Sequence, residues 1–344
     1  MNDSGKCVSR REFLQKIILG GCLLSVKPMR LFSRMATASS EAPVPAFRFD
    51  YRTTAVRHLA ELQAEFEALK SAGQISDNPK FRAIIDKFSF NLPENFRDAK
   101  TVIVLATFTP LSLVNIQYAG NVYQFFMPPQ YSDDGISLDD LTATLRRTVL
   151  QEKDYRLERA RYLFLKRLAV RSGLAQYGRN NITFVEGMGS FITLYAFLTD
   201  YQSPTDNWQE LKMMKSCQKC MICRRACPNQ CIRDEKFVID AGRCTTLYNE
   251  SAGEIPQWIA PTAHNALMGC MRCQYGCPAN QTVIKKTTQL EDISEAEVQQ
   301  ILSGAIDEPT REILQRKLRD FYPVTKREYL PIITRNLKLL LPSA

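Results

Sequence analysis

The feature that most constrains this chain is a dense group of cysteines in its second half. Residues 217–228 read CQKCMICRRACP, so four cysteines occupy eleven consecutive positions and proline follows the last. Further cysteines lie at positions 244, 270, 273 and 277. Thiols at C-x-x-C spacing can converge on one metal centre, whereas structural disulfides usually join distant segments, so the spacing predicts metal ligation.

The first run matches C-x2-C-x2-C-x3-C-P, the pattern of bacterial ferredoxins. In that pattern the first three cysteines ligate one [4Fe–4S] cluster and the fourth ligates another, so a second set of cysteines is required. Cys270, Cys273 and Cys277 repeat the end of the run, and Cys244 supplies the missing ligand. The sequence therefore predicts two clusters with crossed ligands. The first set is Cys217, Cys220, Cys223 and Cys277, and the second is Cys227, Cys244, Cys270 and Cys273.

Zinc is the alternative metal, but two closed zinc sites rarely use a run of this kind. The chain has only two histidines, His58 and His264, which excludes most histidine-based metal and triad chemistry. Cys231 is left over between the two runs, and we expect it to be a small buried hydrophobic residue, because free cysteine packs in that way.

Basic side chains flank the cysteine runs. Clusters with four thiolate ligands carry net negative charge, and nearby cations would offset part of it and ease reduction. Ordinary surface solvation is an equally good interpretation, and the sequence leaves both open. These side chains are Lys219, Arg224, Arg225 and Arg243.

The N-terminus contains a targeting pattern. Arg10 and Arg11 precede a short apolar run over residues 17–26, and residues 36–38, Ala-Thr-Ala, offer a small-x-small cleavage site. A short N-terminal helix with chance arginines is the alternative. The run is about half of the roughly 20 residues that span a bilayer. The pattern predicts export by the twin-arginine machinery to the periplasm, with membrane association only through a partner.

Charge bears on the partners. The formal net charge is +9, with no block of like charges. A mild excess of this kind is typical of a solvated surface, so we expect no nucleic-acid partner. Two clusters imply a redox partner protein that donates electrons.

Composition and spacing divide the chain into consecutive parts. The predicted parts are a twin-arginine signal at 1–38, a Ser/Ala/Pro linker at 39–52, an α/β cofactor or substrate domain at 53–207, a ferredoxin-type double [4Fe–4S] domain at 208–282, and a helical C-terminal region at 283–344. The first half is predicted to be α/β, or α+β if its few strands are antiparallel.

Apolar spacing predicts the individual elements of that first half. In chain order they are helices over 53–72 and 79–88, a buried strand over 101–108, a loop over 109–135, one long helix or two helices over 138–150 and 157–172, and a hairpin over 182–200 that turns at residues 187–189.

Several stretches together resemble a known family. They are LAVRSGLAQYGRNNI at 168–182, GMGSFITLYAFLTD at 187–200, both cysteine runs, RCTTLYNE at 243–250 and YLPIITRNLKLLL at 329–341. From about residue 166 to 341 the chain resembles the cobalamin-dependent epoxyqueuosine reductases and, more distantly, the reductive dehalogenases. Cys244 is the most specific point, because ordinary ferredoxins lack it. The dehalogenases are also similar in carrying a twin-arginine signal.

The resemblance implies an upstream half that holds a corrinoid and a substrate above one cluster. Gly173 and the turn Gly178, Arg179 and Asn180 would lie beside the corrinoid, since glycine lets the backbone approach a flat ligand. The alternative is an ordinary helix end at Gly173 followed by a tight turn.

The sequence departs from the epoxyqueuosine reductases at one point. That family has a strand ending in a catalytic aspartate, soon followed by proline, between the two helices expected here. In this chain the helices are predicted to run together through residues 151–162, with no strand and no Asp-x-x-Pro. Asp154 lies in this interval on a helical pattern and is not assigned as the catalytic acid, and the departure argues against a corrinoid.

The catalytic residue is therefore left unassigned. The dehalogenase resemblance offers tyrosine as proton donor, and the candidates are Tyr118, Tyr123, Tyr131 and Tyr177. The function expected from the sequence is an exported oxidoreductase that passes single electrons from two [4Fe–4S] clusters to a site in the N-terminal half. The alternative is an electron-transfer subunit of a periplasmic or membrane redox complex, without a substrate of its own. A purely structural role for the clusters is a third possibility.

Overall fold

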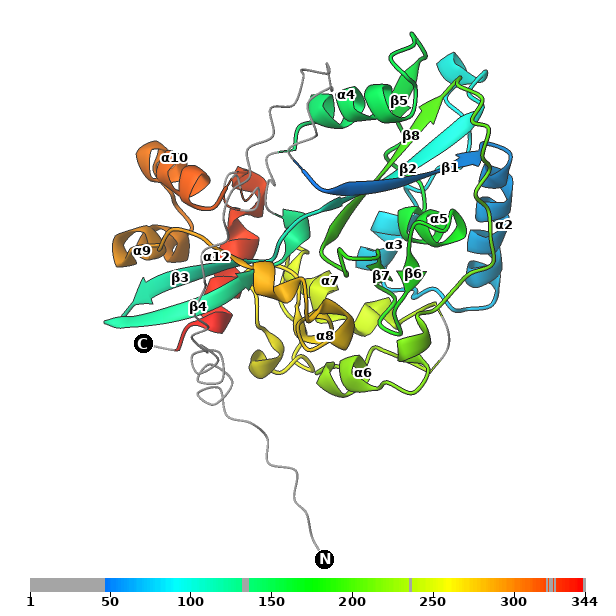
Figure 1. Cartoon of the computed structure of the whole chain (residues 1–344). Helices are drawn as coiled ribbons and strands as arrows, with labels where there is room; N and C mark the ends of the chain where they lie inside the picture. The colour runs from blue at the N-terminus through cyan, green and yellow to red at the C-terminus, as the bar shows by residue number, and fades with distance from the viewer. Residues whose placement is uncertain are drawn as a thin grey trace, which may run out of the picture. The chain divides into compact units, whose positions relative to one another are not determined.

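A four-stranded antiparallel sheet organises the first half of the chain (Figure 1). Its strands, in spatial order, are β1 (Phe49–Ala55), β2 (Thr101–Phe108), β8 (Ile192–Thr199) and β5 (Leu157–Arg159). The computed structural model describes residues 47–342 except 132–135, 235–236, 320, 322–323 and 325. The predicted export signal at 1–38 lies outside these residues.

Strand β2 is buried on both faces, as its apolar run predicted. Val102, Val104 and Ala106 face the helices on one side, α2 (His58–Ser71) and α5 (Leu165–Arg171). The alternate residues Ile103 and Leu105 pack on the other side. There they meet α4 (Leu138–Thr148), which begins at a capping box formed by Ser137 and Asp140. Helices therefore cover both faces of the sheet.

Antiparallel pairing decides the fold class. The β1–β2, β2–β8 and β5–β8 pairs all run antiparallel, so the mixed first half is α+β rather than α/β. The predicted fold class, with a cluster segment and a helical end after this half, is confirmed. Residues 45–344 form one compact unit, and the predicted domain boundaries inside it stay a prediction.

The predicted loop over 109–135 is instead a hairpin. Strands β3 (Ser112–Tyr118) and β4 (Asn121–Met127) pair antiparallel, and their turn has positive φ at Ala119 and Gly120. The hairpin projects away from the main sheet (Figure 1). Its alternating buried Val114 and Ile116 form a period-two pattern that scattered polar residues obscured in the sequence.

The stretch predicted as one or two helices contains a strand. After α4 the chain forms β5, which pairs with β8 from Leu157 to Arg159, and then α5. Asp154 lies in the irregular segment before β5, not on a helix. Pairing with the edge of the sheet overrides the local helical pattern here.

Two other boundaries shift for the same reason. The helix predicted from residue 53 begins at His58, because the preceding residues pair with β2 as β1. The second helix, α3 (Pro79–Ile85), ends close to its predicted end.

The glycine turn at 187–189 is present, with positive φ at Gly187 and Gly189, but its arms do not form one hairpin. Strand β7 (Thr183–Phe184) pairs with β6 (Gln176–Tyr177), while β8 joins the main sheet.

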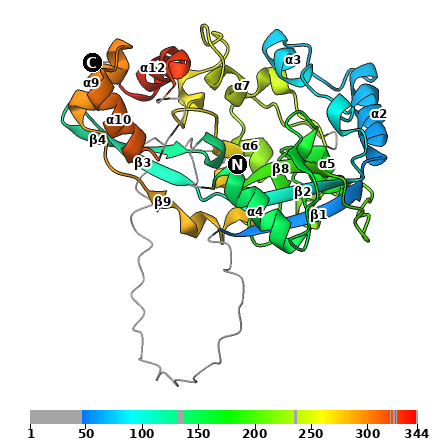
Figure 2. The same cartoon turned by 90° about the horizontal axis from the view of Figure 1, so that it is seen from above.

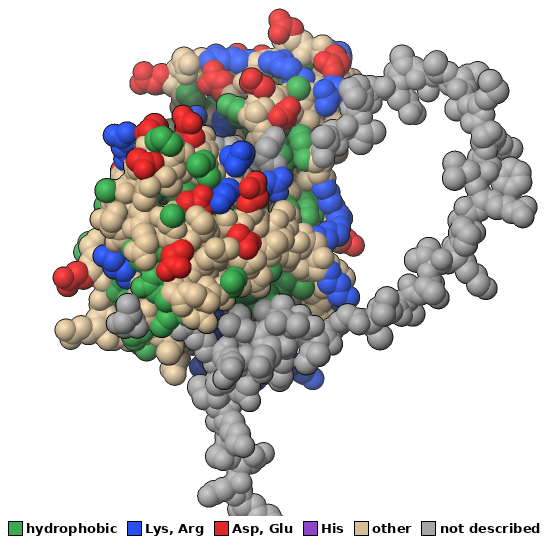
Figure 3. All heavy atoms as spheres, turned by 90° about the vertical axis from the view of Figure 1, so that its left-hand side faces the viewer, with side chains coloured by type: hydrophobic (Ala, Val, Ile, Leu, Met, Phe, Trp, Pro, Cys, Tyr) green, Lys and Arg blue, Asp and Glu red, His purple; other side chains and the backbone are tan. Residues whose placement is uncertain are grey.

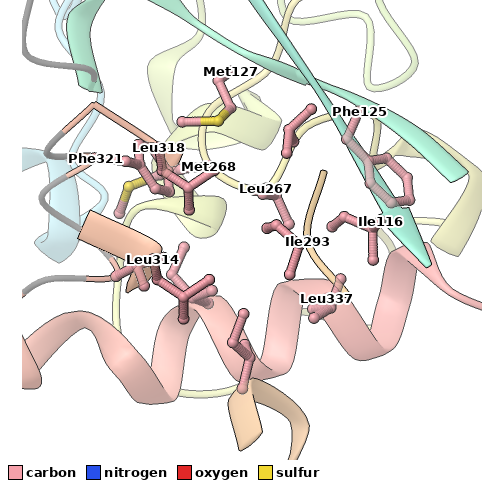
Figure 4. Packing of buried hydrophobic residues seen from close by; sticks show 14 of the residues in the cluster. Ile116, Phe125, Met127, Leu267, Met268, Ile293, Leu314, Leu318, Phe321 and Leu337 are labelled. Carbon is pink, nitrogen blue, oxygen red and sulfur yellow. The ribbon is translucent and has the colours of Figure 1, made fainter. Parts of the chain in front are cut away.

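The C-terminal region is helical, as predicted, and packs against the hairpin. Its helices are α9 (Glu295–Ser303), α10 (Glu308–Lys317) and α12 (Leu330–Leu340), and the short β9 (Thr288–Gln289) pairs parallel with β3. Figure 4 shows the shared core, where Ile116 and Phe125 of the hairpin lie near Leu337 of α12 and Leu267 of the cysteine segment. The hairpin and α12 thus fix one side of that segment.

The cysteine segment has only short helices. They are α6 (Ile222–Ala226), α7 (Thr245–Asn249) and α8 (Arg272–Tyr275), which Figure 1 shows below the main sheet. The face on the side of α9 and α10 carries acidic and basic side chains mixed together (Figure 3). None of the described helices is long and apolar enough to cross a bilayer.

Candidate metal centre

The two cysteine runs fold into similar local structures. Helices α6 and α8 lie against each other, each preceded by a methionine. After each helix the backbone becomes extended, at Cys227 (φ −74°, ψ 113°) and at Cys277 (φ −73°, ψ 124°), and proline follows. An extended residue directs its side chain away from the preceding helix. This geometry is what ligation of the opposite centre requires of the fourth cysteine.

The thiols of the first predicted set lie near one another. Burial, followed by the neighbouring thiols of Cys217, Cys277 and Cys220, raises the pKa of the Cys223 thiol to about 11. Burial also raises the pKa of Cys277, with Cys217 and Cys220 contributing. Cys277, far along the sequence, therefore lies among the thiols of the first run.

The thiols of the second predicted set form another neighbourhood. Burial, followed by the thiols of Cys270 and Cys244, raises the pKa of Cys273 well above its usual value. The thiol of Cys227 in turn interacts electrostatically with the thiol of Cys244. Both neighbourhoods are therefore compatible with the crossed assignment, which stays a prediction.

The donor chemistry around these thiols fits clusters. Backbone N–H groups of Asn229, Cys231 and Ile232 donate hydrogen bonds to Cys227, and those of Ala279 and Asn280 donate to Cys277. Such N–H donors stabilise thiolate charge. Within the described part of the chain, no three His, Cys, Asp or Glu side chains lie close enough to hold a single ion. A cubane needs no such convergence, because each thiolate binds a different iron.

Cys231 is buried, as expected, but it lies among the second set. Its Sγ is 3.3 Å from Cys227 Sγ, and its backbone N–H donates to the same sulfur over 3.4 Å. It also hydrogen-bonds the thiol of Cys244. The second neighbourhood therefore contains a fifth thiol, and the spacing of the runs did not reveal it.

The residues that the family resemblance placed beside a corrinoid contact the protein itself. Arg179 donates to the carbonyl oxygens of Cys217, Gln218 and Cys220, and Asn180 Nδ2 donates to Cys273 O over 3.2 Å. An added Cβ would meet Gln209 at Gly173 and would meet Phe184 at Gly178. The turn 178–181 holds both cysteine runs, while Gly173 lies at the end of α5.

Two polar residues near the thiols escaped the sequence analysis. Asn265 Nδ2 donates to Cys270 Sγ over 3.2 Å, and its Oδ1 accepts from Met271 N over 2.9 Å. Lys166 lies on α5, and its charge interacts with the thiols of Cys244 and Cys273. Neither residue stands in a motif, so only the tertiary structure could have revealed them.

The predicted cations are all exposed. Arg224 pairs with Asp234, and Arg243 lies over the Trp258 ring. Arg224, Arg225 and Arg233 line an open hollow of about 690 Å³ whose wall includes Cys227. A basic hollow therefore lies directly beside one predicted ligand of the second set.

The four candidate tyrosines do not converge. Tyr118 and Tyr123 pack on the core of the C-terminal helices, and Tyr177 is buried beside Phe237. Tyr131 is buried and donates its hydroxyl to Glu250. Gly269, next to Cys270, approaches the Tyr131 ring so closely that an added Cβ would meet it. Tyr131 is thus the candidate that, within the described residues, pairs with a titratable acid in the cysteine segment.

Burial raises the pKa of Glu250 to about 7. Because the folded pKa lies above the unfolded one, this group stabilises the fold fully below about pH 4.5 and loses that contribution as pH rises through about 7. Glutamine resembles the protonated acid at every pH. We therefore expect the stability of Glu250→Gln, relative to that of the natural protein, to increase as pH rises through this range. Thermal unfolding at about pH 5 and about pH 8 checks this. The exposed control Glu312→Gln should show no such change, and a constant difference for Glu250→Gln would contradict the shift.

The end of β5 differs chemically from the family expectation. The resemblance implies an aspartate at the end of the strand between these two helices, and the structure does place a strand there. It ends at Arg159, whose guanidinium lies over the Tyr195 ring. The strand is thus present although the sequence analysis missed it, but its last residue is an arginine and not an aspartate.

Comparison with known proteins supports the double cluster. A family described as "4Fe-4S double cluster binding domain" matches residues 216–280. The epoxyqueuosine reductase of Escherichia coli is 34% identical over 128 residues, which are 37% of this chain and 32% of that protein. That of Pseudomonas aeruginosa is 30% identical over 117 residues, 34% and 31% of the two chains. The chain therefore matches about a third of the length of these relatives.

Solved structures extend the likeness to the fold. The epoxyqueuosine reductase of Bacillus subtilis, with its aspartate-bearing catalytic loop swung out of the active site, has a TM-score of 0.59 and 19% identity. The match covers 85% of this chain and 76% of that one. An epoxyqueuosine reductase bound to a modified tRNA stem-loop has the same TM-score, 0.59, with 18% identity over 85% of this chain and 76% of its own. The predicted resemblance to the epoxyqueuosine reductases is confirmed.

These relatives contradict the predicted cellular role. The exclusion of nucleic-acid partners is wrong, because one similar structure holds a tRNA stem-loop. Export to the periplasm is wrong as well, because the relatives are named for reducing a tRNA nucleoside and tRNA stays in the cytoplasm. The exported, single-electron assignment and its alternative, a periplasmic or membrane electron-transfer subunit, are not retained. An iron–sulfur oxidoreductase agrees with the relatives.

Proposed function

We propose that this chain, a relative of the epoxyqueuosine reductases, is an iron–sulfur oxidoreductase that reduces a nucleoside carried by tRNA. The observation that carries the proposal is the likeness of the cluster segment to enzymes named for that reaction, joined to the fold of a tRNA-bound structure. The chain matches only about a third of those relatives' sequences, so substrate and reaction are part of the proposal.

The proposal includes two [4Fe–4S] clusters held by the crossed sets. When bound, they supply reducing electrons. The protein's own part is to hold the cysteine loops in place. Arg179 donates hydrogen bonds to backbone carbonyl oxygens of the first run, and Asn180 donates to a backbone carbonyl oxygen of the second. Asn280 donates to Ser190 Oγ and Gln274 O. These contacts fix the spacing of the two runs without using their sulfurs.

A basic surface for RNA supports the substrate class. The hollow lined by Arg224, Arg225 and Arg233 opens to solvent. A guanidinium group can bind a phosphate through two parallel hydrogen bonds. We propose that a backbone phosphate of the RNA lies there. Asp234 lies in the same wall and pairs with Arg224, and Arg233 pairs with Asp240, so Arg225 is the better candidate among the described arginines of the hollow.

The proposal does not include a corrinoid. Gly178, Arg179 and Asn180 are engaged by neighbouring parts of the chain, and Gly173 faces Gln209. Arg159 occupies the position at the end of β5 where the family resemblance implies an acid. The chemistry toward the nucleoside therefore differs at these positions from what the family resemblance implies, and the natural nucleoside of this chain can differ from epoxyqueuosine.

Turnover of tRNA tests the proposal. Anaerobically purified protein with both clusters is reduced with dithionite and mixed with tRNA from cells that lack epoxyqueuosine reductase. We expect a nucleoside of that tRNA to change in mass by reduction, as measured by mass spectrometry of the digested tRNA. A complete set of unchanged nucleosides, with tRNA that binds no better than a DNA duplex of similar length, would overturn the proposal.

The arginine hollow gives a second measurement. Removing one phosphate contact makes the negative slope of log affinity against log salt concentration less steep by about 1. We expect Arg225→Gln to show this loss in tRNA binding. Arg316→Gln on α10, which is exposed and lies away from α6 in both cartoon views (Figures 1 and 2), is the matched control. An unchanged slope in Arg225→Gln would contradict a phosphate at this site.

A further inference from the structure

Lys166 is a lysine whose surroundings differ from those of the other cations near the clusters. It lies at the start of α5, and its Nζ donates to the carbonyl O and to Oδ1 of Asn181, both over 3.1 Å. Asn181 itself has φ of 58°, which places its carbonyl and side-chain oxygens together on the ammonium. The lysine is therefore held by a fixed turn and not by flexible partners.

No carboxylate balances this charge. Within the described ranges, the hydrogen bonds of Lys166 go to Asn181 alone and no ion pair involves it. A cation in a buried position is costly unless an anion lies nearby. Burial lowers the pKa of the Lys166 ammonium, and the thiols of Cys244 and Cys273, both in the second ligand set, oppose that shift by favouring its charged form. The surroundings of Lys166 thus need negative charge from that set.

The same turn connects Lys166 to the ligands by direct contacts. Asn180 Nδ2 donates to Cys273 O over 3.2 Å, and Asn181, the next residue, accepts from Lys166. On its other side, Asn181 Nδ2 donates to Phe237 O over 2.5 Å. Helix α5, the turn and the second cysteine run are therefore held together at this point.

We propose that Lys166 is the fixed counter-charge of the second [4Fe–4S] cluster and raises its reduction potential. The inference rests on the two clusters of the proposed function. Reduction adds one electron, and hence one negative charge, to a cluster whose thiolate ligands already make it negative. The Lys166 side chain is partly buried, and a partly buried ammonium stabilises that added charge more than an exposed one, because water and salt screen it less.

The exposed cations provide the contrast. Lys219 lies within the first run, between Cys217 and Cys220, but its side chain is exposed, so solvent screens its charge. Arg179 lies on the first run and donates to three of its carbonyl oxygens. The counter-charge argument therefore assigns Lys166 to the second cluster and predicts an effect on that cluster only.

Redox titration monitored by EPR tests this assignment without any substrate. We expect Lys166→Gln to lower the equilibrium constant for reduction of one cluster by about tenfold, which lowers its reduction potential by about 59 mV for one electron. The potential of the other cluster should not change. Lys166→Arg should keep the potential near that of the natural protein, and Lys219→Gln should shift neither cluster. Iron content, measured on each variant, reports separately whether both clusters are present.

Every outcome bears on the proposal. An unchanged potential in Lys166→Gln with full iron overturns it, as does an equal shift in Lys219→Gln. Loss of four irons in Lys166→Gln, with retention in Lys166→Arg, supports the need for positive charge. Loss in both variants shows that the lysine stem only fills space, and overturns it. Because no RNA is present, a failed tRNA assay does not affect these results.

Discussion

Replacing Cys277 with alanine should remove the cluster held by Cys217, Cys220 and Cys223, far earlier in the sequence. The Cys277 thiol lies among those of the first run, and a cubane with three protein ligands is labile. Iron content should fall from about eight to about four per chain, and the EPR signal of one reduced cluster should disappear. The activity proposed for the chain should be lost with it. Iron analysis and EPR of the anaerobic protein measure this.

The reciprocal variant needs a more careful design. Cys227→Ala should damage the cluster of Cys270 and Cys273, but Cys231 Sγ lies only 3.3 Å from Cys227 Sγ and can take its place. We therefore expect the double variant Cys227→Ala with Cys231→Ala to lose more iron than Cys227→Ala alone. Cys231→Ala by itself should keep about eight irons. Loss of four irons in that single variant would show that Cys231 is a ligand and would sink the crossed assignment.

The two predicted ligand sets follow from local spacing in the sequence and stay a prediction. In a C-x-x-C run the chain itself determines which thiols are neighbours, and Cys244 was found by counting what the second set lacked. Cys231 shows the limit of this reasoning. Its Sγ contacts Cys227 and Cys244, and the second contact depends on a chain path that no spacing rule describes.

The fold was predictable where burial is complete and less so at its edges. Strand β2 was placed at residues 101–108 because both of its faces are buried, which leaves a continuous apolar run. The hairpin β3–β4 and the short strand β5 were missed. Each is half-exposed, and pairing with a neighbouring strand decides its conformation against its local pattern. The missed strand β5 mattered most, because its absence was part of the argument against family chemistry.

Removing the carboxylate of Glu65 should destabilise the protein more than any other single change outside the cysteines that we consider. Glu65 lies on α2 and forms ion pairs with Arg167 and Arg171 of α5. The three side chains are only 16%, 9% and 17% exposed. Breaking a buried pair leaves an uncompensated charge, which costs about 3–5 kcal/mol. Here one carboxylate balances two guanidinium groups, so Glu65→Ala should reach the upper part of that range.

Thermal unfolding of the cluster-loaded protein measures the loss, with Glu67→Ala as the matched control. Glu67 lies on the same helix and pairs with Lys70, but its side chain is 52% exposed, so we expect a change of about 0–1 kcal/mol. A loss for Glu65→Ala no larger than that of the control would contradict the buried network. Helix α5 also carries Lys166 and leads into the turn that holds both cysteine runs. Loosening it should therefore shift the potential of the second cluster in the direction of Lys166→Gln, which links the stability of α2 and α5 to the redox centre.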